Sequence, residues 1–355
     1  MNGSSAEEIL SRRHWLAAYG RRIPAEINPD AYGSVLDMLE AAMQRYAEKP
    51  AFRCFGRTLT YADTDRLSRK VAGYLQGKLG VRKGDRIAVM LPNLPAFPLA
   101  MLGIVRAGAV QVNVNPLYTP RELEHQLNDA GAEIIVIFSG ASPTLAEIIG
   151  NTNVKHVIVV ETGDGVGAKL PSPPVDARLA NVITFSDVVA EGGDFAFKPV
   201  AVRGDDLLFL QYTGGTTGLS KGAALTHRNL VANTEQFKAF MPDALRPGRE
   251  VVVTALPLYH IFALMVNFIT YYSIGAENWL VPNPRDMDGF IDVLRKARCT
   301  IFTGVNTLFG GLLRPRQPSR LHLERYGRAQ CGPSATGAKI FLAVSNTKTF
   351  PEHAI

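Results

Sequence analysis

The chain has 355 residues, of which 46% are hydrophobic and 20% are charged, and its formal net charge is +6. This composition excludes a disordered, collagen-like or coiled-coil chain, and the length predicts two domains or one large domain with subdomains. The three cysteines lie far apart and form no Cys-x-x-Cys pair. That usage excludes a disulfide framework and a zinc site, and it favours a reducing cytoplasm.

The excess positive charge lies near the C-terminal end of the sequence. Residues 314–355 contain seven Lys or Arg against two acidic residues, whereas the first 313 residues have a net charge of +1. This basic tail has no sustained helical or strand period, and it lacks aromatic interleaving or repeated Arg-Gly units. We therefore interpret it as a terminal segment and expect no nucleic acid among the partners.

From residue 31 to residue 160, predicted helices alternate with short apolar strands. Residues 34–48 form a helical stripe, and Thr60 is a suitable N-cap for a helix that ends near Gly80. The predicted strands of this region are residues 86–91, 109–115, 133–138 and 154–160. Strands that are apolar on both faces and separated by helices are typical of a parallel sheet covered on both sides. The sequence therefore predicts an α/β subdomain over residues 31–160, after an N-terminal segment of residues 1–30.

The pattern lapses over residues 161–204, a Gly- and Pro-rich stretch that we interpret as a connection. A second α/β subdomain is predicted for residues 205–313, with a helix from about His227. Its predicted strands are residues 206–212, 251–257, 278–282 and 300–304.

Targeting and membrane signals are weak in this sequence. The first residues include Glu7 and Glu8 and no apolar core, so a cytoplasmic protein without a signal peptide is predicted. The apolar stretch 261–276 contains Asn267 and is shorter than the ~20 residues that cross a bilayer. A buried helix is the favoured interpretation of this stretch, and peripheral contact with the inner face of the membrane stays open as an alternative.

The most informative segment is the string LQYTGGTTGLSK, residues 210–221, which follows a predicted strand. Its three closely spaced glycines let backbone N–H groups close around an anion, threonine hydroxyls add donors, and Lys221 adds a positive charge. A loop of this kind between a strand and a helix is suited to hold phosphate. It is not a Walker sequence, because Ser220 precedes Lys221 and Gly222 follows it, and no Gly-x-Gly-x-x-Gly supports a dinucleotide fold. An ordinary surface turn is the alternative.

The string YTGGTTGLSKGA resembles the signature loop of adenylate-forming enzymes, which include acyl-CoA synthetases, luciferases and peptide-synthetase adenylation domains. The strings KGDRIAVMLPNLPAFPLAMLGIVRAGAV, LPLYHIFAL and TGVNTLF closely resemble bacterial long-chain fatty acid–CoA ligases. The resemblance covers roughly residues 14–313. It implies an α/β fold, namely the N-terminal domain of this family with two α/β subdomains.

The resemblance implies a reaction in which a carboxylate attacks the α-phosphate of ATP to give an acyl-adenylate, from which CoA then displaces AMP. A long-chain fatty acid is the implied substrate, with ATP and Mg²⁺ as cofactors and CoA as co-substrate. Catalysis of this kind requires neutralising the charge of the transferring phosphoryl group. The residues implied to bind the phosphates are Thr213, Gly214, Gly215, Thr216, Thr217, Gly218 and Lys221.

Two further site segments follow from the resemblance. His260, in the string LPLYH, matches a family histidine beside the phosphates and the acyl carboxylate, so His260 and Lys221 are the implied catalytic residues. Gly304, Val305 and Asn306 match a segment that lines the acyl pocket. A satisfied core histidine and a plain strand end with a turn are the alternatives for these two segments. No residue is assigned as a metal ligand.

The sequence departs from the family pattern after Leu313. The family continues with an adenine-contacting turn, a Tyr-Gly-x-Thr-Glu motif, a ribose-binding Asp and a small C-terminal domain, and residues 314–355 match none of these. We therefore expect a truncated enzyme, with an out-of-frame tail as one account, that has little or no ligase activity alone. The alternative is a catalytically inactive fragment that retains only acyl or phosphate binding, and a basic nucleic-acid or membrane protein ranks third.

Overall fold

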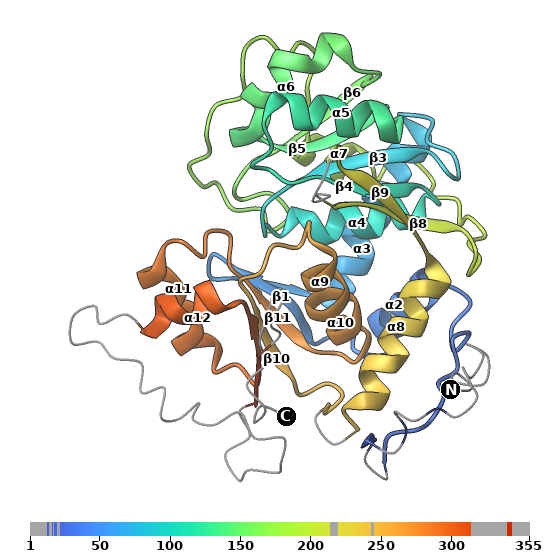
Figure 1. The fold of residues 1–355 in the computed structure, drawn as a ribbon. Coiled ribbons are helices and arrows are strands. Elements are labelled where there is room, and N and C mark those ends of the chain that lie inside the picture. The colour runs from blue at the N-terminus through green and yellow to red at the C-terminus, as the bar shows by residue number, and fades with distance from the viewer. Residues whose placement is uncertain are drawn as a thin grey trace, which may run out of the picture.

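The computed structural model describes residues 13, 16, 18–19, 22–213, 219–242, 245–313 and 339–342. Its strands form two sheets, one of seven strands and one of six, which lie one above the other in Figure 1. Helices fill the space between the sheets and cover their outer faces (Figure 1). The predicted α/β class is confirmed.

The seven-stranded sheet is parallel except for one pair. Its strands are β3 (Arg86–Met90), β4 (Val110–Asn113), β5 (Ile134–Phe138), β6 (His156–Val160), β7 (Ile183–Thr184), β8 (Leu207–Thr213) and β9 (Lys221–Thr226). They have the order β7-β6-β5-β3-β4-β8-β9, and only β9 runs antiparallel to its neighbour. Ile87 and Val89 of β3 point between the sheets, whereas Ala88 and Met90 pack against the outer helices. This two-sided burial explains why the sequence shows apolar runs without alternation.

The six-stranded sheet joins both ends of the chain. Its strands are β1 (Pro50–Cys54), β2 (Arg57–Thr60), β10 (Val251–Thr254), β11 (Glu277–Leu280), β12 (Ile301–Gly304) and β13 (Lys339–Leu342), in the order β13-β12-β10-β11-β1-β2. β2 is antiparallel to β1, and the other pairs are parallel. The sequence analysis predicts no strand before residue 86, so the β1–β2 hairpin is a difference. It forms because β11, more than 200 residues away, offers β1 a parallel partner.

The helices divide by the face of the sheet that they cover. Their bounds are α2 (Val35–Arg45), α3 (Tyr61–Gly77), α4 (Ala96–Arg106), α5 (Pro120–Ala130), α6 (Ser142–Ile148), α7 (Phe185–Glu191), α8 (His227–Phe240), α11 (Met287–Ala297) and α12 (Asn306–Leu313), with 3-10 turns η2 (Ser139–Ala141) and η3 (Ile149–Asn151). α5 and α6 cover the outer face of the seven-stranded sheet, and α3 and α4 lie between the sheets. α11 and α12 cover the outer face of the six-stranded sheet.

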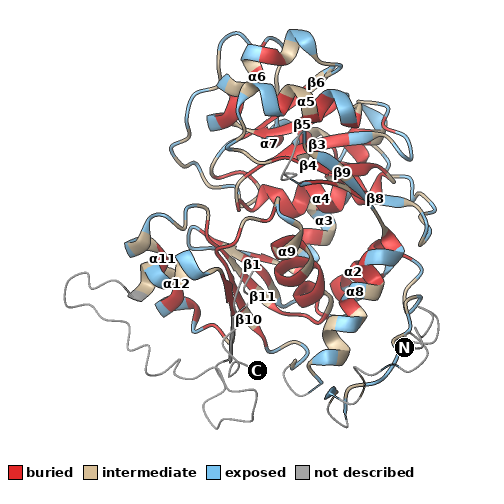
Figure 2. Cartoon of the chain, viewed as in Figure 1, coloured by how far each residue is buried: buried red, intermediate tan, exposed pale blue. Residues whose placement is uncertain are grey.

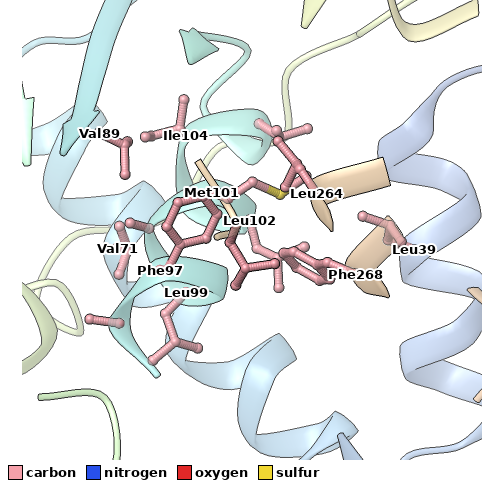
Figure 3. Packing of buried hydrophobic residues seen from close by; sticks show 14 of the residues in the cluster. Leu39, Val71, Val89, Phe97, Leu99, Met101, Leu102, Ile104, Leu264 and Phe268 are labelled. Atoms are coloured by element: carbon pink, nitrogen blue, oxygen red, sulfur yellow. The ribbon is translucent and has the colours of Figure 1, made fainter. Parts of the chain in front are cut away.

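The largest hydrophobic core lies between the two sheets, where buried residues are concentrated (Figure 2). α4 is buried along its whole length, and its Phe97, Met101 and Leu102 lie at the centre of this core (Figure 3). Leu264 and Phe268 reach the same core from the apolar stretch 261–276 (Figure 3). Since burial contributes about 25 cal/mol per Å² of apolar surface, a cluster of this size holds the two sheets together.

The apolar stretch 261–276 is a buried helix, as predicted, but an irregular one. It consists of α9 (Ile261–Ala263), the π-helix η4 (Leu264–Thr270) and α10 (Tyr271–Ser273). Asn267 lies within the π-helix and is fully buried. Within the part of the chain that the structure describes, no helix has the length and apolar character that crossing a membrane requires.

The chain passes between the two sheets more than once. β8 and β9, from the predicted second subdomain, complete the seven-stranded sheet beside β4, whereas β1 and β2, from the predicted first subdomain, lie beside β11. The sheets are therefore not divided at the connection of residues 161–204. Strands from each side of this connection pair with remote strands in the sheet of the other side. The predicted N-cap at Thr60 is confirmed. Its hydroxyl accepts a hydrogen bond from the Asp63 N–H, and the Asp63 carboxylate accepts one from the Thr60 N–H.

Most of the predicted terminal segments lie outside the described residues, including residues 1–12, 314–338 and 343–355. The described part of the predicted tail is β13, which pairs in parallel with β12. A strand in this position is a further difference, since the sequence analysis finds no strand period after Leu313.

Candidate active site

The carboxyl ends of central strands from both sheets meet at one junction. β3 and β8 of the seven-stranded sheet end there, and so does β10 of the six-stranded sheet. Asn93, after β3, and Gln211, in β8, form hydrogen bonds there with the backbone of residues 254–259, which follow β10. Ligands of α/β proteins bind outside the carboxyl ends of parallel strands. This junction is therefore the candidate active site.

The predicted phosphate loop connects two antiparallel strands, and we call β8, residues 214–220 and β9 the phosphate hairpin. Thr213 ends β8 directly opposite Lys221, the first residue of β9, and both are exposed. The predicted order of strand, loop and helix omits a strand, because residues 221–226 form β9 and pair with the edge of β8. The helix predicted from about His227 begins after this strand, as α8. The predicted residues Gly214, Gly215, Thr216, Thr217 and Gly218 lie outside the described residues.

Close packing favours a glycine just beyond the loop. A Cβ at Gly222 would lie 3.0 Å from the ring of Tyr212, which stands opposite on β8. Tyr212 is itself held in place, because its hydroxyl donates a hydrogen bond to Asp129 on α5. Burial, together with this carboxylate, raises the pKa of Tyr212 above its ordinary value, so the phenol stays protonated.

His260 lies at the N-terminus of α9 with an exposed side chain. Its Nδ1 accepts a hydrogen bond from the Phe262 N–H over 3.3 Å, so the neutral ring carries its proton on Nε2. The alternative of a satisfied core histidine does not hold, because the side chain is exposed. Nε2 is therefore available as a donor to an anion.

Two buried amides join the phosphate hairpin to the segment before His260. Asn113 Nδ2 donates to Gln211 Oε1 over 3.0 Å, and Gln211 Nε2 donates to the Tyr259 carbonyl over 3.3 Å. Both amide side chains are buried. Since Gln211 is two residues from Thr213 and Tyr259 is next to His260, these bonds fix the two predicted segments relative to each other.

Asn93, in the turn after β3, holds the same segment from another side. Its Nδ2 donates to the carbonyls of Thr254 over 3.1 Å and Leu256 over 2.9 Å, and its Oδ1 accepts from the Leu258 N–H over 2.8 Å. Only 3% of this residue is exposed. Asn93 is not predicted as a site residue, because the string PNLP after a strand predicts no more than a turn.

The predicted acyl-pocket segment begins at Gly304, the last residue of β12. Gly304 is buried, and a Cβ there would lie 2.9 Å from the Phe309 ring, so a side chain at this position would require Phe309 to move. Val305 is half-buried against the core between the sheets, and Asn306 is exposed at the start of α12. β12 runs parallel to β10, so this segment and the residues that lead to His260 leave the same edge of the sheet.

A buried polar network connects these two strand ends to the π-helix. Thr303 Oγ1 donates to Asn267 Oδ1 over 2.8 Å, and Asn267 Nδ2 donates to Thr254 Oγ1 over 3.1 Å. The Thr254 hydroxyl then donates to Asn278 Oδ1 over 2.7 Å. A satisfied polar network of this kind favours one arrangement of the surrounding core, and π-helical turns often lie at functional sites.

The structure therefore brings Thr213 and Lys221, at the ends of the two hairpin strands, to the same junction as His260 and residues 304–306. The contacts described for them run through the backbone and through Gln211, Asn93 and Asn267, which the sequence analysis does not assign to the site. Among the described residues, no group of three His, Cys, Asp or Glu side chains is placed to bind a metal ion.

Two stacked α/β sheets, with strands of both sheets ending at one junction, place the chain among α/β proteins that bind ligands at the carboxyl ends of parallel strands. The family model of the AMP-binding enzymes matches residues 39–344, and the chain belongs to this family. The match continues past Leu313, where the sequence analysis ends the resemblance.

Two curated relatives from different bacteria carry the same description. The chain is 46% identical over 321 residues to the long-chain-fatty-acid–CoA ligase of Salmonella typhimurium, an alignment that covers 87% of this chain and 57% of the relative. It is 42% identical over 364 residues to the enzyme of the same description from Yersinia pestis, covering 91% of this chain and 65% of the relative. The chain thus spans less than two thirds of the length of these relatives.

Solved structures agree with the fold. A long-chain-fatty-acid-CoA ligase from Archaeoglobus fulgidus superposes with a TM-score of 0.68 at 26% identity, covering 83% of this chain and 56% of the other. An anthranilate CoA ligase in complex with anthranoyl-AMP superposes with a TM-score of 0.71 at 22% identity, covering 82% and 54%. The resemblance to adenylate-forming enzymes and to their N-terminal α/β domain is confirmed.

Proposed function

We propose that this chain is the part of a long-chain fatty acid–CoA ligase that binds the phosphates of ATP and the acyl group. The observation that carries the proposal is the hydrogen bond from Gln211 to the Tyr259 carbonyl, which holds the phosphate hairpin beside the His260 segment. A glycine-rich hairpin with Lys221 and an exposed imidazole donor then serve one anionic substrate. The relatives of this chain, named as long-chain-fatty-acid–CoA ligases, support the substrate class.

The chemistry of the whole enzyme assigns a role to each segment. In the first step a carboxylate oxygen of the fatty acid bonds to the α-phosphorus of ATP, the bond from that phosphorus to the bridging oxygen breaks, and pyrophosphate leaves. Lys221 and the backbone N–H groups of the hairpin stabilise negative charge on the β- and γ-phosphates, and His260 Nε2–H donates to an oxygen of the α-phosphate or of the carboxylate. The CoA thiol then loses its proton to solvent, its sulfur bonds to the acyl carbon, the bond from that carbon to the phosphate oxygen breaks, and AMP leaves.

Magnesium would be bound chiefly by the phosphate oxygens of ATP, because the described residues hold no cluster of three metal-ligating side chains, and it would neutralise part of the phosphate charge. The acyl chain would lie against Gly304, Val305 and Asn306, beside the core between the sheets. Peripheral contact with a membrane, where fatty acids partition, belongs to the same proposal.

A second candidate function is ligand binding without catalysis. It is supported by the positions of Thr213, Lys221 and His260, which account for binding an anion without any further step. The two candidates differ in turnover and agree in phosphate binding, so one set of measurements separates them.

The test measures MgATP binding by calorimetry and acyl-CoA formation from oleate, ATP and CoA, both with the 355-residue chain. We expect MgATP to bind and Lys221→Ala to raise its Kd roughly tenfold or more, because the variant loses a charge-assisted contact. Lys169→Ala, at an exposed lysine in the connection, is the matched control and should leave the Kd unchanged.

We expect acyl-CoA formation to be absent or very slow in this chain, which would support the binding candidate. Turnover above that of Lys221→Ala would instead show the complete reaction. A chain that binds neither MgATP nor inorganic tripolyphosphate would overturn the proposed function.

A further inference from the structure

α5 contacts the phosphate hairpin at β8 and at the residue directly before β9. His125 and Asp129 are four positions apart on this helix and therefore lie on the same side of it. The Tyr212 hydroxyl on β8 donates to Asp129 Oδ2, and His125 Nε2 hydrogen-bonds the Ser220 carbonyl, directly before β9, over 3.0 Å. One helix thus holds the hairpin on both sides of its loop, and none of these contacts involves the substrate-binding residues assigned above.

We propose that His125 and Asp129 are positioning residues that fix the neck of the phosphate hairpin, defined as Tyr212, Ser220 and Gly222, for binding phosphate. The effect on phosphate binding rests on the proposed function of the hairpin. The attachment of the neck to α5 rests only on the contacts just described.

The chemistry of the two contacts sets the form of each side chain. The Ser220 carbonyl can only accept, so His125 must carry a proton on Nε2. Asp129 accepts from a phenol whose proton is retained. Tyr212 in turn packs against Gly222 so closely that a Cβ there would lie 3.0 Å from its ring. Tyr212 thus contacts both α5 and β9, so the position of α5 constrains that of β9.

α5 is itself a fixed support. A capping box between Thr119 and Glu122 closes its first turn, and Gly131 ends it in the left-handed conformation at φ 61°. Leu123 and Leu127 are fully buried in the core on the outer face of the seven-stranded sheet. The polar side of the same helix therefore presents His125 and Asp129 at constant positions.

The exposed part of the contact continues along α5. Leu219, which is 63% exposed, lines a shallow groove with Pro120 of α5 and Ile148 of α6. The returning side of the hairpin therefore lies over these two helices. Backbone N–H groups bind an anion most tightly when the strands that carry them are already ordered, because little conformational entropy is then lost on binding.

The first test follows trypsin cleavage after Lys221 by mass spectrometry in the 355-residue chain without ligand. His125→Leu and Asp129→Ala remove the two contacts, whereas His125→Gln retains a donor and Asp129→Asn retains an acceptor. We expect the first pair to be cleaved at this bond roughly three- to tenfold faster, since one hydrogen bond is lost, and the second pair to stay near the wild-type rate. His156→Leu and Asp205→Ala are matched controls, because the described hydrogen bonds include none from either side chain.

The second test measures the Kd of inorganic tripolyphosphate for the same variants. We expect His125→Leu and Asp129→Ala to weaken binding several-fold and the two conservative variants to restore it. Urea midpoints identify any variant that no longer folds. For such a residue, the cleavage rate and the tripolyphosphate Kd of the conservative variant are compared with the wild-type values instead.

Wild-type cleavage rates in His125→Leu and Asp129→Ala would overturn the proposal, and so would faster cleavage with unchanged tripolyphosphate binding. A wild-type chain that binds neither MgATP nor tripolyphosphate overturns the proposed function instead. The cleavage rates then still decide whether α5 fixes the neck, because they require no ligand.

Discussion

Replacing Asn93 by alanine tests how the two sheets are fixed to each other at the candidate active site. The side chain is 3% exposed and makes three hydrogen bonds to the backbone of residues 254–258. At about 1 kcal/mol net for each bond, the loss amounts to about 3 kcal/mol. The Thr254 carbonyl keeps a second donor, the Val281 N–H at 3.0 Å, whereas the Leu256 carbonyl and the Leu258 N–H keep no other described partner.

We therefore expect Asn93→Ala to lower the free energy of unfolding by about 3 kcal/mol, measured by urea unfolding followed by circular dichroism. Asn93→Asp should cost at least as much, because it replaces the donor to two carbonyl oxygens by a charged acceptor. Asn233→Ala, at an exposed asparagine of α8, is the control and should change stability by less than about 0.5 kcal/mol. A loss below about 1 kcal/mol for Asn93→Ala, with an unchanged slope, would refute this reasoning.

Two further predictions concern buried charged or titratable side chains. His227 is 2% exposed, its Nδ1 accepts from the Val35 N–H, and burial lowers its pKa from 6.5 to about 4. The unfolded chain therefore binds a proton more readily, so the stability contributed by the neutral ring is present above pH 6.5 and falls by about 3 kcal/mol as the pH drops towards 4. Urea unfolding at pH 7.5 and pH 5 should show this trend in the wild type but not in His227→Asn, and equal losses in both would contradict it. Arg106 is fully buried and donates to Glu40 over 2.6 Å and to Asp65 over 2.5 Å. Because both carboxylates are about a third exposed and can be rehydrated, Arg106→Met should cost about 2 kcal/mol, less than the loss of a fully buried pair, and an unchanged urea midpoint would contradict this.

Elements that carry their own signal could be predicted from the sequence. β3 and β5 are apolar on both faces because helices cover both sides of their sheet, and such runs between turn residues permit few other structures. The capping box at Thr60 is equally local, since its two partners lie three residues apart. For the same reason the phosphate motif and the string around His260 indicate the site without any knowledge of the fold.

Elements that depend on a remote partner could not be predicted in this way. β9 is a half-exposed strand rich in Gly and Ala, and only its pairing with β8 distinguishes it from a loop before α8. Asn93, His125 and Asp129 act through partners more than 80 positions away. Their local strings predict a turn and the polar face of a helix, so nothing nearby marks them as part of the site.

The pairing of β1 with β11 has a consequence for the synthesis of this protein. β1 leaves the ribosome more than 200 residues before its partner. The rings on which its Phe52 packs, Phe268 and Tyr272, are also synthesised more than 200 residues later. The core between the sheets can therefore close only after about four-fifths of the chain has been translated. Until then the β1–β2 hairpin edge and its apolar surface remain uncovered on the nascent chain, and we expect folding factors that shield such surfaces to bind there.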